Sequence, residues 1–110
     1  MSHLLVLTNL PDTASAQALA RVLVDQRLAA CVNIMAPASS LYRWQGKIES
    51  AAEVLLLIKT MAQRYDALEA AIKTHHPYEL PEIVAIPITQ GLPGYLAWIE
   101  AETRAAVQPC

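Results

Sequence analysis

The chain has 110 residues, of which 55% are hydrophobic and only 16% are charged, and its formal net charge is −2. This length fits one domain over residues 1–110, and a surface so poor in charge indicates that part of it is shared with another subunit. The acidic balance argues against nucleic-acid binding, and no apolar run approaches the roughly 20 residues of a membrane span. Cys31 and Cys110 form no disulfide framework, so we expect a cytoplasmic protein.

The N-terminal part predicts a strand followed by a helix. Residues 3–9 are a short apolar run that ends at Pro11, so we expect a strand there. Asp12, Thr13 or Ser15 can cap the helix that follows. Its apolar residues lie close to one stripe, which predicts one buried face: Ala16, Leu19, Ala20, Leu23 and Leu28.

A long β-hairpin is predicted over residues 30–60, with Gly46 at its turn. An unbroken arm over residues 30–45 would span roughly 50 Å, whereas a compact chain of this length has a radius of gyration of about 13 Å. We therefore expect the hairpin to extend beyond its own domain. Pro37 cannot donate to a strand ladder and predicts a kink in the first arm.

Apolar side chains crowd this hairpin, both at its tip and along residues 54–58, where both faces of the strand are apolar. One of these faces needs a cover, and we expect another subunit to supply it. The alternative is that Pro37 divides the first arm into two modest strands, which fold back over the monomer's own core. The predicted interface residues are Tyr42, Trp44, Val54 and Leu56.

The rest of the chain predicts a helix, an extended connector, an edge strand, a short helix and a frayed tail. The first helix carries apolar residues at helical spacing from Met61 onward and ends by His76, because Pro77 disfavours helix before it. The later boundaries follow from the prolines: a connector between Pro77 and Pro81, a strand over residues 83–88 with Pro87 at an edge, a helix from Pro93, and a tail that frays from Thr103.

This order of elements predicts the α+β class. Two strand-helix units joined through a hairpin form the ferredoxin-like split βαβ sandwich, in which helices cover one face of an antiparallel sheet. The long β-hairpin and the extra C-terminal helix are additions to that plan. The fold by itself indicates little about function, because it carries many unrelated activities.

The strongest cluster for chemistry lies on the proline-bounded connector: His75, His76, Tyr78, Glu79 and Glu82. Imidazole and carboxylate are good ligands for zinc or copper. Successive side chains diverge, so one histidine can ligate without the other. The alternative is structural: His75 closes the helix near its carbonyl end, and Tyr78 packs as core.

Other candidates carry a weaker signal. Cys31 is soft enough for copper, but a lone cysteine in a strand is more often a small buried hydrophobe. Lys59 with Glu53 and Arg43 could hold a small anion in a cleft between subunits, and the alternative is solvated charges at a strand edge. The sequence contains no glycine-rich phosphate loop, and Ser39-Ser40 has no evident partners to make a nucleophile.

Four blocks of the sequence together resemble the CutA divalent-cation tolerance family. They occur in the family's order and spacing and span nearly the whole chain, with the tryptophan-glycine hairpin tip and the His-Pro-Tyr connector the most distinctive. The resemblance implies a ferredoxin-like domain that forms stable PII-like trimers through its long hairpins. The blocks are Cys31-Val32-Asn33-Ile34, Ser40-Leu41-Tyr42-Arg43-Trp44-Gln45-Gly46-Lys47-Ile48, Leu57-Ile58-Lys59-Thr60 and His76-Pro77-Tyr78-Glu79-Leu80-Pro81-Glu82-Ile83.

The resemblance also implies a function: a non-enzymatic trimer involved in the response to copper and other divalent cations, with weak binding through His75 and His76. Some members add a cysteine of the first strand, but the matching position here is Thr8, which is not a soft ligand. Two alternatives stay open. One is a signalling trimer that binds a small molecule, and the other is an enzyme that uses His76, Tyr78 and Glu79 or Glu82 as acid and base.

Overall fold

The structure is a computed structural model that describes residues 2–105. One antiparallel sheet in the order β2-β4-β1-β5 is packed against helices, and β3 pairs with β4 outside that order. This arrangement confirms the predicted ferredoxin-like α+β class. The elements are β1 (His3–Leu10), α1 (Thr13–Asp25), β2 (Cys31–Ile34), β3 (Ala38–Trp44), β4 (Lys47–Met61), a 3-10 helix (Ala62–Arg64), α2 (Tyr65–His75), β5 (Val84–Ile88) and α3 (Pro93–Glu102).

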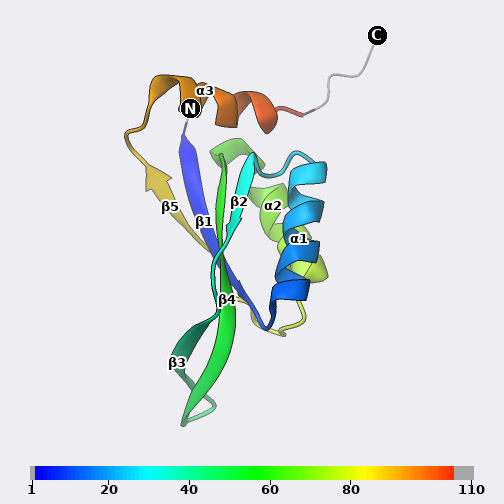
Figure 1. The fold of residues 1–110 in the computed structure, drawn as a ribbon, viewed down its shortest axis with the longest axis vertical. Coiled ribbons are helices and arrows are strands. Elements are labelled where there is room, and N and C mark those ends of the chain that lie inside the picture. The colour runs from blue at the N-terminus through cyan, green and yellow to red at the C-terminus, as the bar shows by residue number, and fades with distance from the viewer. Residues whose placement is uncertain (1, 106–110) are drawn as a thin grey trace.

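Helices α1 and α2 lie side by side on one face of the sheet (Figure 1). Asp12 caps α1, because its Oδ1 accepts a hydrogen bond of 2.7 Å from the backbone N–H of Ser15. Helix α2 ends at His75 and the chain turns extended at His76, as the proline at position 77 predicts. Both helices therefore begin or end where the sequence indicates.

The core lies between these helices and the sheet. Every second side chain of β1 and of the C-terminal half of β4 points into it, and Val6, Leu56 and Ile58 are 0% exposed. The intervening residues form the opposite face of the sheet, where Leu7 and Leu57 are half-buried. That second face is apolar but only partly covered within the chain.

The burial of β4 corrects one interface prediction. Val54 and Leu56 are 1% and 0% exposed and belong to the chain's own core, so they offer no surface to a second subunit. Their neighbours Leu55 and Leu57 are the partly exposed members of this run. Both faces of the run are apolar, so its sequence pattern did not indicate which face the helices would cover.

The hairpin of β3 and β4 turns at two residues with positive φ, Gln45 at 50° and Gly46 at 81°, which is the pattern of a type I′ turn. Before it, the first arm is broken between β2 and β3 at residues 35–37, which confirms the kink predicted at Pro37. The hairpin projects beyond the helices (Figure 1), and the molecule measures 53 × 31 × 23 Å. Its radius of gyration of 15.0 Å exceeds the value of about 13 Å for a compact chain.

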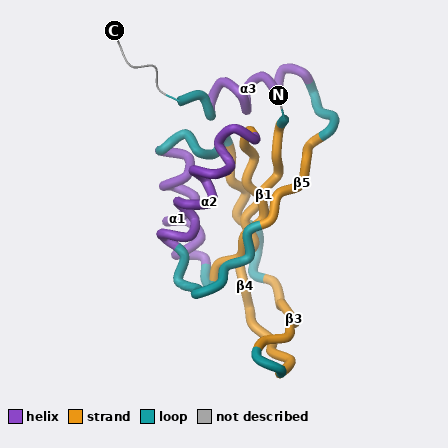
Figure 2. The backbone as a smooth tube through the Cα atoms, turned by 180° about the vertical axis from the view of Figure 1, so that it is seen from behind, coloured by secondary structure: helices purple, strands orange, loops and turns teal. Residues whose placement is uncertain are grey.

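Helix α3 crosses one end of the sheet (Figure 2), where Ile99 packs against Met61 and Ala30. Met61 pairs with His3 of β1, so it is the last residue of β4 rather than part of the following helix, which opens with a 3-10 turn at residue 62. Thr103, at the start of the predicted tail, is 2% exposed and its hydroxyl donates to the carbonyl of Ile99. The rest of the predicted tail, residues 106–110, lies outside the described residues.

Candidate functional site

The connector between α2 and β5, residues 76–83, passes the end of β1 and the base of the hairpin. Pro77 and Pro81 restrict its backbone, and Ile83 packs against the core at its far end. This path carries the polar side chains of the connector to the strand that holds Glu53. The site predicted from the His-Pro-Tyr cluster is thus built from three parts of the chain that are distant in sequence.

His76 is a structural residue of the connector. It is 8% exposed, and its Nε2 donates to the backbone carbonyl of Asn9 while its Nδ1 accepts from the backbone N–H of Tyr78 at 3.1 Å. A carbonyl can only accept and an amide N–H can only donate, so the ring is neutral with its proton on Nε2. One ring nitrogen holds the connector against β1 and the other is used within the connector, so neither has a lone pair left for a metal.

His75 is arranged differently. It is exposed on the last turn of α2, and its Nδ1 donates to the backbone carbonyl of Ala71 at 2.9 Å. Its Nε2 therefore carries a lone pair that has no partner among the described residues. The two adjacent histidines serve different elements, and they do not share a ligand position.

Metal ligands are sparse around this imidazole. Within residues 2–105, no group of three or more histidine, cysteine, aspartate or glutamate side chains lies close enough together to hold an ion. Thr8, at the position where some members of the family have cysteine, is 0% exposed and faces the core beneath the helices. A cation bound at His75 would therefore complete its coordination with water or with groups of another chain.

Tyr78 and Glu53 form the polar centre of the site. The Tyr78 hydroxyl donates a hydrogen bond of 2.9 Å to Oε2 of Glu53, which is only 9% exposed. Burial of the phenol, together with this hydrogen bond, raises the pKa of Tyr78 to about 12. Tyr78 is thus a neutral hydrogen-bond donor near neutral pH, and its ring lies against that of His76 at a centroid distance of 4.8 Å.

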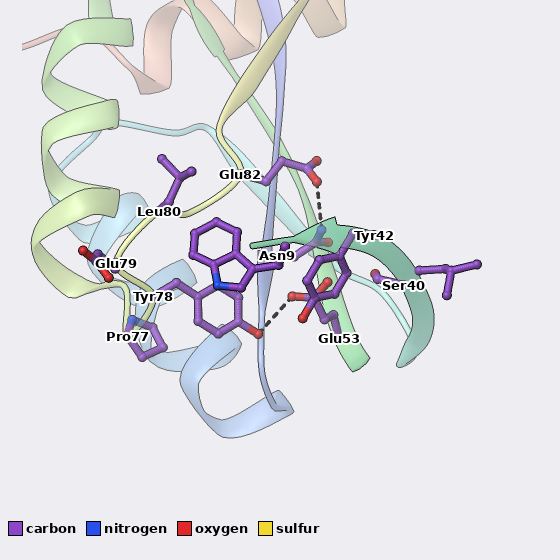
Figure 3. Close-up of a pocket in the computed structure, with 11 residues that line it drawn as sticks. Asn9, Ser40, Tyr42, Glu53, Pro77, Tyr78, Glu79, Leu80 and Glu82 are labelled. Atoms are coloured by element: carbon purple, nitrogen blue, oxygen red, sulfur yellow. Dashed lines mark hydrogen bonds between the residues drawn. The ribbon is translucent and has the colours of Figure 1, made fainter. Parts of the chain in front are cut away.

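A pocket of about 720 Å³ opens between the connector and the hairpin, and we call it the connector pocket. Figure 3 shows its two hydrogen bonds, from Tyr78 to Glu53 and from Asn9 Nδ2 to Oε1 of Glu82 at 3.1 Å. Its walls come from β1, the hairpin and the connector. The lining residues are Asn9, Ser40, Leu41, Tyr42, Trp44, Glu53, Pro77, Tyr78, Glu79, Leu80 and Glu82.

Sequence reasoning assigned no role in a binding site to two polar residues of this pocket, Asn9 and Ser40. Asn9 reads as a strand end and Ser40 as an ordinary strand residue, so neither carries a local signal for a site. Their roles depend on contacts across the fold: Asn9 meets Glu82, which is 73 residues away. Such contacts are set by the register of the sheet and cannot be read from spacing alone.

Of the other predicted residues, Glu53 lines the connector pocket, whereas Lys59, Cys31 and Arg43 are not among its lining residues. Lys59 donates to Oδ1 of Asn33 at 2.7 Å and lies 4.0 Å from Sγ of Cys31, on the face of the sheet away from α1 and α2. Glu53 and Arg43 lie further along the hairpin, paired with Ala38 and Ile48. Within one chain these three charged residues do not gather into an anion site.

None of the helices within residues 2–105 is both long enough and apolar enough to cross a membrane. Exposed aromatic residues instead occur on the hairpin and on α3, where Tyr95 and Trp98 are 40% and 42% exposed. Their rings lie 5.4 Å apart. These exposed aromatic side chains of the hairpin and of α3 lie on the surface of the folded domain.

The fold and the connector agree with a known class of protein, the CutA1 divalent ion tolerance proteins, whose family model matches residues 4–102. The chain belongs to this family. The divalent-cation tolerance protein CutA of Thermus thermophilus is 45% identical over 98 residues, which cover 89% of this chain and 95% of that protein. Protein CutA of Mus musculus is 43% identical over 95 residues, which cover 86% of this chain but 54% of the mouse protein.

Solved structures agree with this assignment. The crystal structure of CutA from Xylella fastidiosa superposes with a TM-score of 0.91 at 46% identity, over 94% of this chain and 100% of that one. The family membership and the fold therefore rest on both sequence and structure.

Proposed function

We propose that this protein is a non-enzymatic divalent-cation tolerance protein that acts as a homotrimer in the cytoplasm and binds copper or zinc weakly. Membership of the CutA1 family supports the general role. The observation that supports the homotrimer is the exposure of the projecting hairpin. Its apolar side chains are not covered by their own chain: Leu41 is 75% exposed, Ile48 66% and Trp44 41%.

Exposed apolar side chains concentrated on one projecting element are typical of a subunit interface. The hairpin continues into the second face of the sheet, where Val84 and Ile86 of the edge strand are about half exposed. Three copies, the number implied by the family resemblance, would bury this continuous surface. Tyr42 and Trp44 are the aromatic anchors that we assign to the contact.

The acid-base alternative has little support in this geometry. His76 uses both ring nitrogens in hydrogen bonds to the backbone, so it cannot exchange protons with a substrate in the folded chain. The raised pKa of Tyr78 makes its hydroxyl a poor proton donor near neutral pH. The hydrogen bonds of His76 and the raised pKa of Tyr78 therefore favour a structural role for these two residues over acid-base catalysis.

For the metal, the donor that we assign is Nε2 of His75. The neighbouring Nδ1 is fixed by Ala71, which orients the ring and leaves the Nε2 lone pair directed away from that carbonyl. A single imidazole with water in the remaining positions binds copper or zinc weakly. A small anion in a cleft between subunits remains a second proposal, which needs Lys59 of one chain beside groups of another.

Calorimetric titration of the full chain with copper(II) and zinc(II) tests the metal proposal. We expect weak binding by the wild type, loss of binding in His75→Ala, and retention in His3→Ala. His3 is a matched control because, like His75, it places one ring nitrogen at a backbone carbonyl, that of Leu96, but it lies at the start of β1 rather than at the end of α2. Binding should also weaken on acidification, because a ligating imidazole must be neutral. Equal heats from His75→Ala and the wild type would contradict the assignment.

A further inference from the structure

Two parts of the surface carry charge that their own chain leaves unbalanced, and the first is the connector pocket. Three of its lining residues are carboxylates, Glu53, Glu79 and Glu82, and none of its lining residues is lysine, arginine or histidine. Within residues 2–105, no ion pair involves any of these three carboxylates. The pocket therefore attracts a cation.

Neutral donors hold two of these carboxylates in place. Oε1 of Glu82 accepts a hydrogen bond of 3.1 Å from Nδ2 of Asn9, and Oε2 of Glu53 accepts one of 2.9 Å from the hydroxyl of Tyr78. In Figure 3 both carboxylates lie on one side of Tyr78, and Glu79 lies on the other side. Glu82 is exposed, so its carboxylate can be reached from outside the chain. It is the member of the pocket that a second molecule can pair with.

The second part is one face of the hairpin, which we call the outer hairpin face. Arg43 pairs with Ile48 in the ladder of β3 and β4, and Leu41 lies two residues before Arg43, so the three side chains share this face. Leu41 and Ile48 are 75% and 66% exposed. Arg43 is exposed and makes no ion pair within residues 2–105. The outer hairpin face thus presents an unpaired guanidinium beside apolar side chains.

Arg43 does not serve the pocket of its own chain. Tyr42 and Trp44 line that pocket, whereas Arg43 does not. Side chains alternate along a strand, so Arg43 points to the opposite face of the hairpin from these two neighbours. The cation that the pocket lacks is therefore available from a second copy of the chain.

The chemistry of the two surfaces is complementary. A guanidinium can donate two parallel hydrogen bonds to a carboxylate and can stack on an aromatic ring. The connector pocket offers both partners, the carboxylate of Glu82 and the aromatic side chains of Tyr42 and Trp44. It also offers Leu80, which is 70% exposed, to the apolar side chains beside Arg43. The volume of about 720 Å³ is in the range that holds small molecules, roughly 300 to 1,000 Å³, so a side chain can enter.

The direction of such a contact agrees with a ring of chains. Each chain would give its outer hairpin face to one neighbour and receive the other neighbour at its connector pocket. Contacts between two different surfaces are head-to-tail, and they close into a ring when the rotation between copies allows it. A trimer is the smallest ring of this kind, because a two-fold dimer brings the same surface of both chains together.

We propose that Arg43 of the partner subunit enters the connector pocket, pairs with Glu82 and stacks against Tyr42 and Trp44. This inference rests on the proposed homotrimer and adds the residue that each copy contributes to the pocket of the next. The buried carboxylate of Glu53 strengthens the attraction, because it places a second negative charge at the same pocket. The pocket is complete only when the partner's Arg43 is in it.

The test is a charge exchange between the two positions, measured by the rate at which chains exchange between oligomers. Native mass spectrometry of mixed unlabelled and isotope-labelled full chains measures this rate and the number of chains in the oligomer. Arg43→Glu and Glu82→Arg should each speed exchange by roughly tenfold or more, because like charges then meet in the pocket. The double variant Arg43→Glu/Glu82→Arg joins opposite charges again and should return to within roughly threefold of the wild type.

Two control variants make the same changes of charge nearby. Lys47→Glu lies on the other face of the same hairpin, paired with Trp44, and Glu79→Arg lies on the other side of Tyr78. Each should change the exchange rate by no more than roughly threefold, the scale of exposed charges.

The outcomes separate this inference from the trimer itself. A wild type that is a single chain overturns both. A wild-type trimer in which Arg43→Glu exchanges no faster than Lys47→Glu, or in which the double variant exchanges as fast as the single ones, leaves the trimer standing and overturns this inference.

A milder pair of variants keeps the test valid if Glu82→Arg fails to fold. Glu82→Gln retains an acceptor for Asn9 and removes only the charge. Arg43→Gln should then speed exchange by several times less in Glu82→Gln than in the wild type, because the pair is already broken. Equal effects of Arg43→Gln in both backgrounds would overturn the pairing.

Discussion

Strand β4 runs through two regions that differ in how far they bury apolar side chains. In its C-terminal half, beneath α1 and α2, Leu56 and Ile58 are 0% exposed. In its N-terminal half, on the projecting hairpin, Ile48 is 66% exposed although it is just as apolar. The difference lies in what packs against the strand, because the helices cover only one half of it (Figure 1). A strand's hydrophobicity thus indicates that it needs a partner and does not indicate whether the partner is in the same chain.

The two regions should respond differently to mutation and to dilution. Burial beneath the helices is complete within one chain, so its contribution to stability does not depend on protein concentration. Burial of the hairpin requires other copies, so its contribution grows with concentration by mass action. The predictions below use that contrast.

The largest effect is expected from Leu56→Ala, in the half of β4 that the helices cover. Removing a fully buried leucine side chain leaves a cavity and should lower the free energy of unfolding by about 2 to 5 kcal/mol. Denaturant unfolding measures this loss, and it should be similar at every protein concentration. Ile48→Ala, the exposed counterpart on the same strand, should show little loss under conditions where the chains are separate.

Trp44→Ala comes next, on the hairpin. An aromatic anchor at a subunit contact typically contributes about 2 kcal/mol or more, so the variant should dissociate at concentrations where the wild type stays assembled. Light scattering over a dilution series measures this dissociation. Trp98→Ala is the matched control, because Trp98 on α3 is 42% exposed against 41% for Trp44. Equal dissociation by both variants would remove the hairpin from its assigned role.

Variants of the two adjacent histidines should differ from each other in unfolding free energy, by less than the effects above. His76→Ala loses two hydrogen bonds, one that holds the connector to β1 at Asn9 and one within the connector from Tyr78, and should cost about 2 kcal/mol of unfolding free energy. His75→Ala changes an exposed helix end and should stay within about 0.5 kcal/mol of the wild type. Denaturant unfolding compares the two variants. The reverse order would mean that His76 does not hold the connector.

The smallest effect concerns alkaline pH. The pKa of Tyr78 is raised from 10.0 to about 12 in the folded chain, so the folded state holds this proton more tightly than the unfolded state. The stability that depends on it is fully present below pH 10 and is lost as the pH rises from 10 to about 12. Denaturation midpoints across that window should fall less steeply in Tyr78→Phe than in the wild type.

Tyr65→Phe is the control for that experiment. The pKa of Tyr65 is also raised, by burial and by its hydrogen bond to Glu69, so it adds a decline in the same direction. The part that belongs to Tyr78 should persist in Tyr65→Phe. An identical pH dependence in Tyr78→Phe and the wild type would contradict the role of the Tyr78–Glu53 hydrogen bond.

Local features of the sequence were sufficient to predict most of the fold. The cap at Asp12, the turn at Gly46, the kink at Pro37 and the helix end before Pro77 each follow from the conformational limits of one residue or its neighbour. The exceptions are instructive. Met61 fits the helical spacing of the following segment, yet its pairing with His3 across the sheet makes it the end of β4.

The site was predicted only in part, because its contacts join distant segments. The cluster of His75, His76 and Tyr78 is visible in the sequence, but the hydrogen bond of His76 to Asn9 spans 67 residues and that of Tyr78 to Glu53 spans 25. These contacts decide which imidazole nitrogen is free and which carboxylate is buried. Both depend on the register of β1 and β4, which no local pattern specifies when both faces of a strand are apolar.

The central claim is that the projecting hairpin is an interface between copies of this chain. Sedimentation equilibrium of the wild-type protein at micromolar concentration tests it most directly. We predict a single species with the mass of three chains of 12.0 kDa, which persists on tenfold dilution. A stable species with the mass of one chain would contradict the claim, because the apolar side chains of the hairpin would then be ordinary solvent-exposed surface.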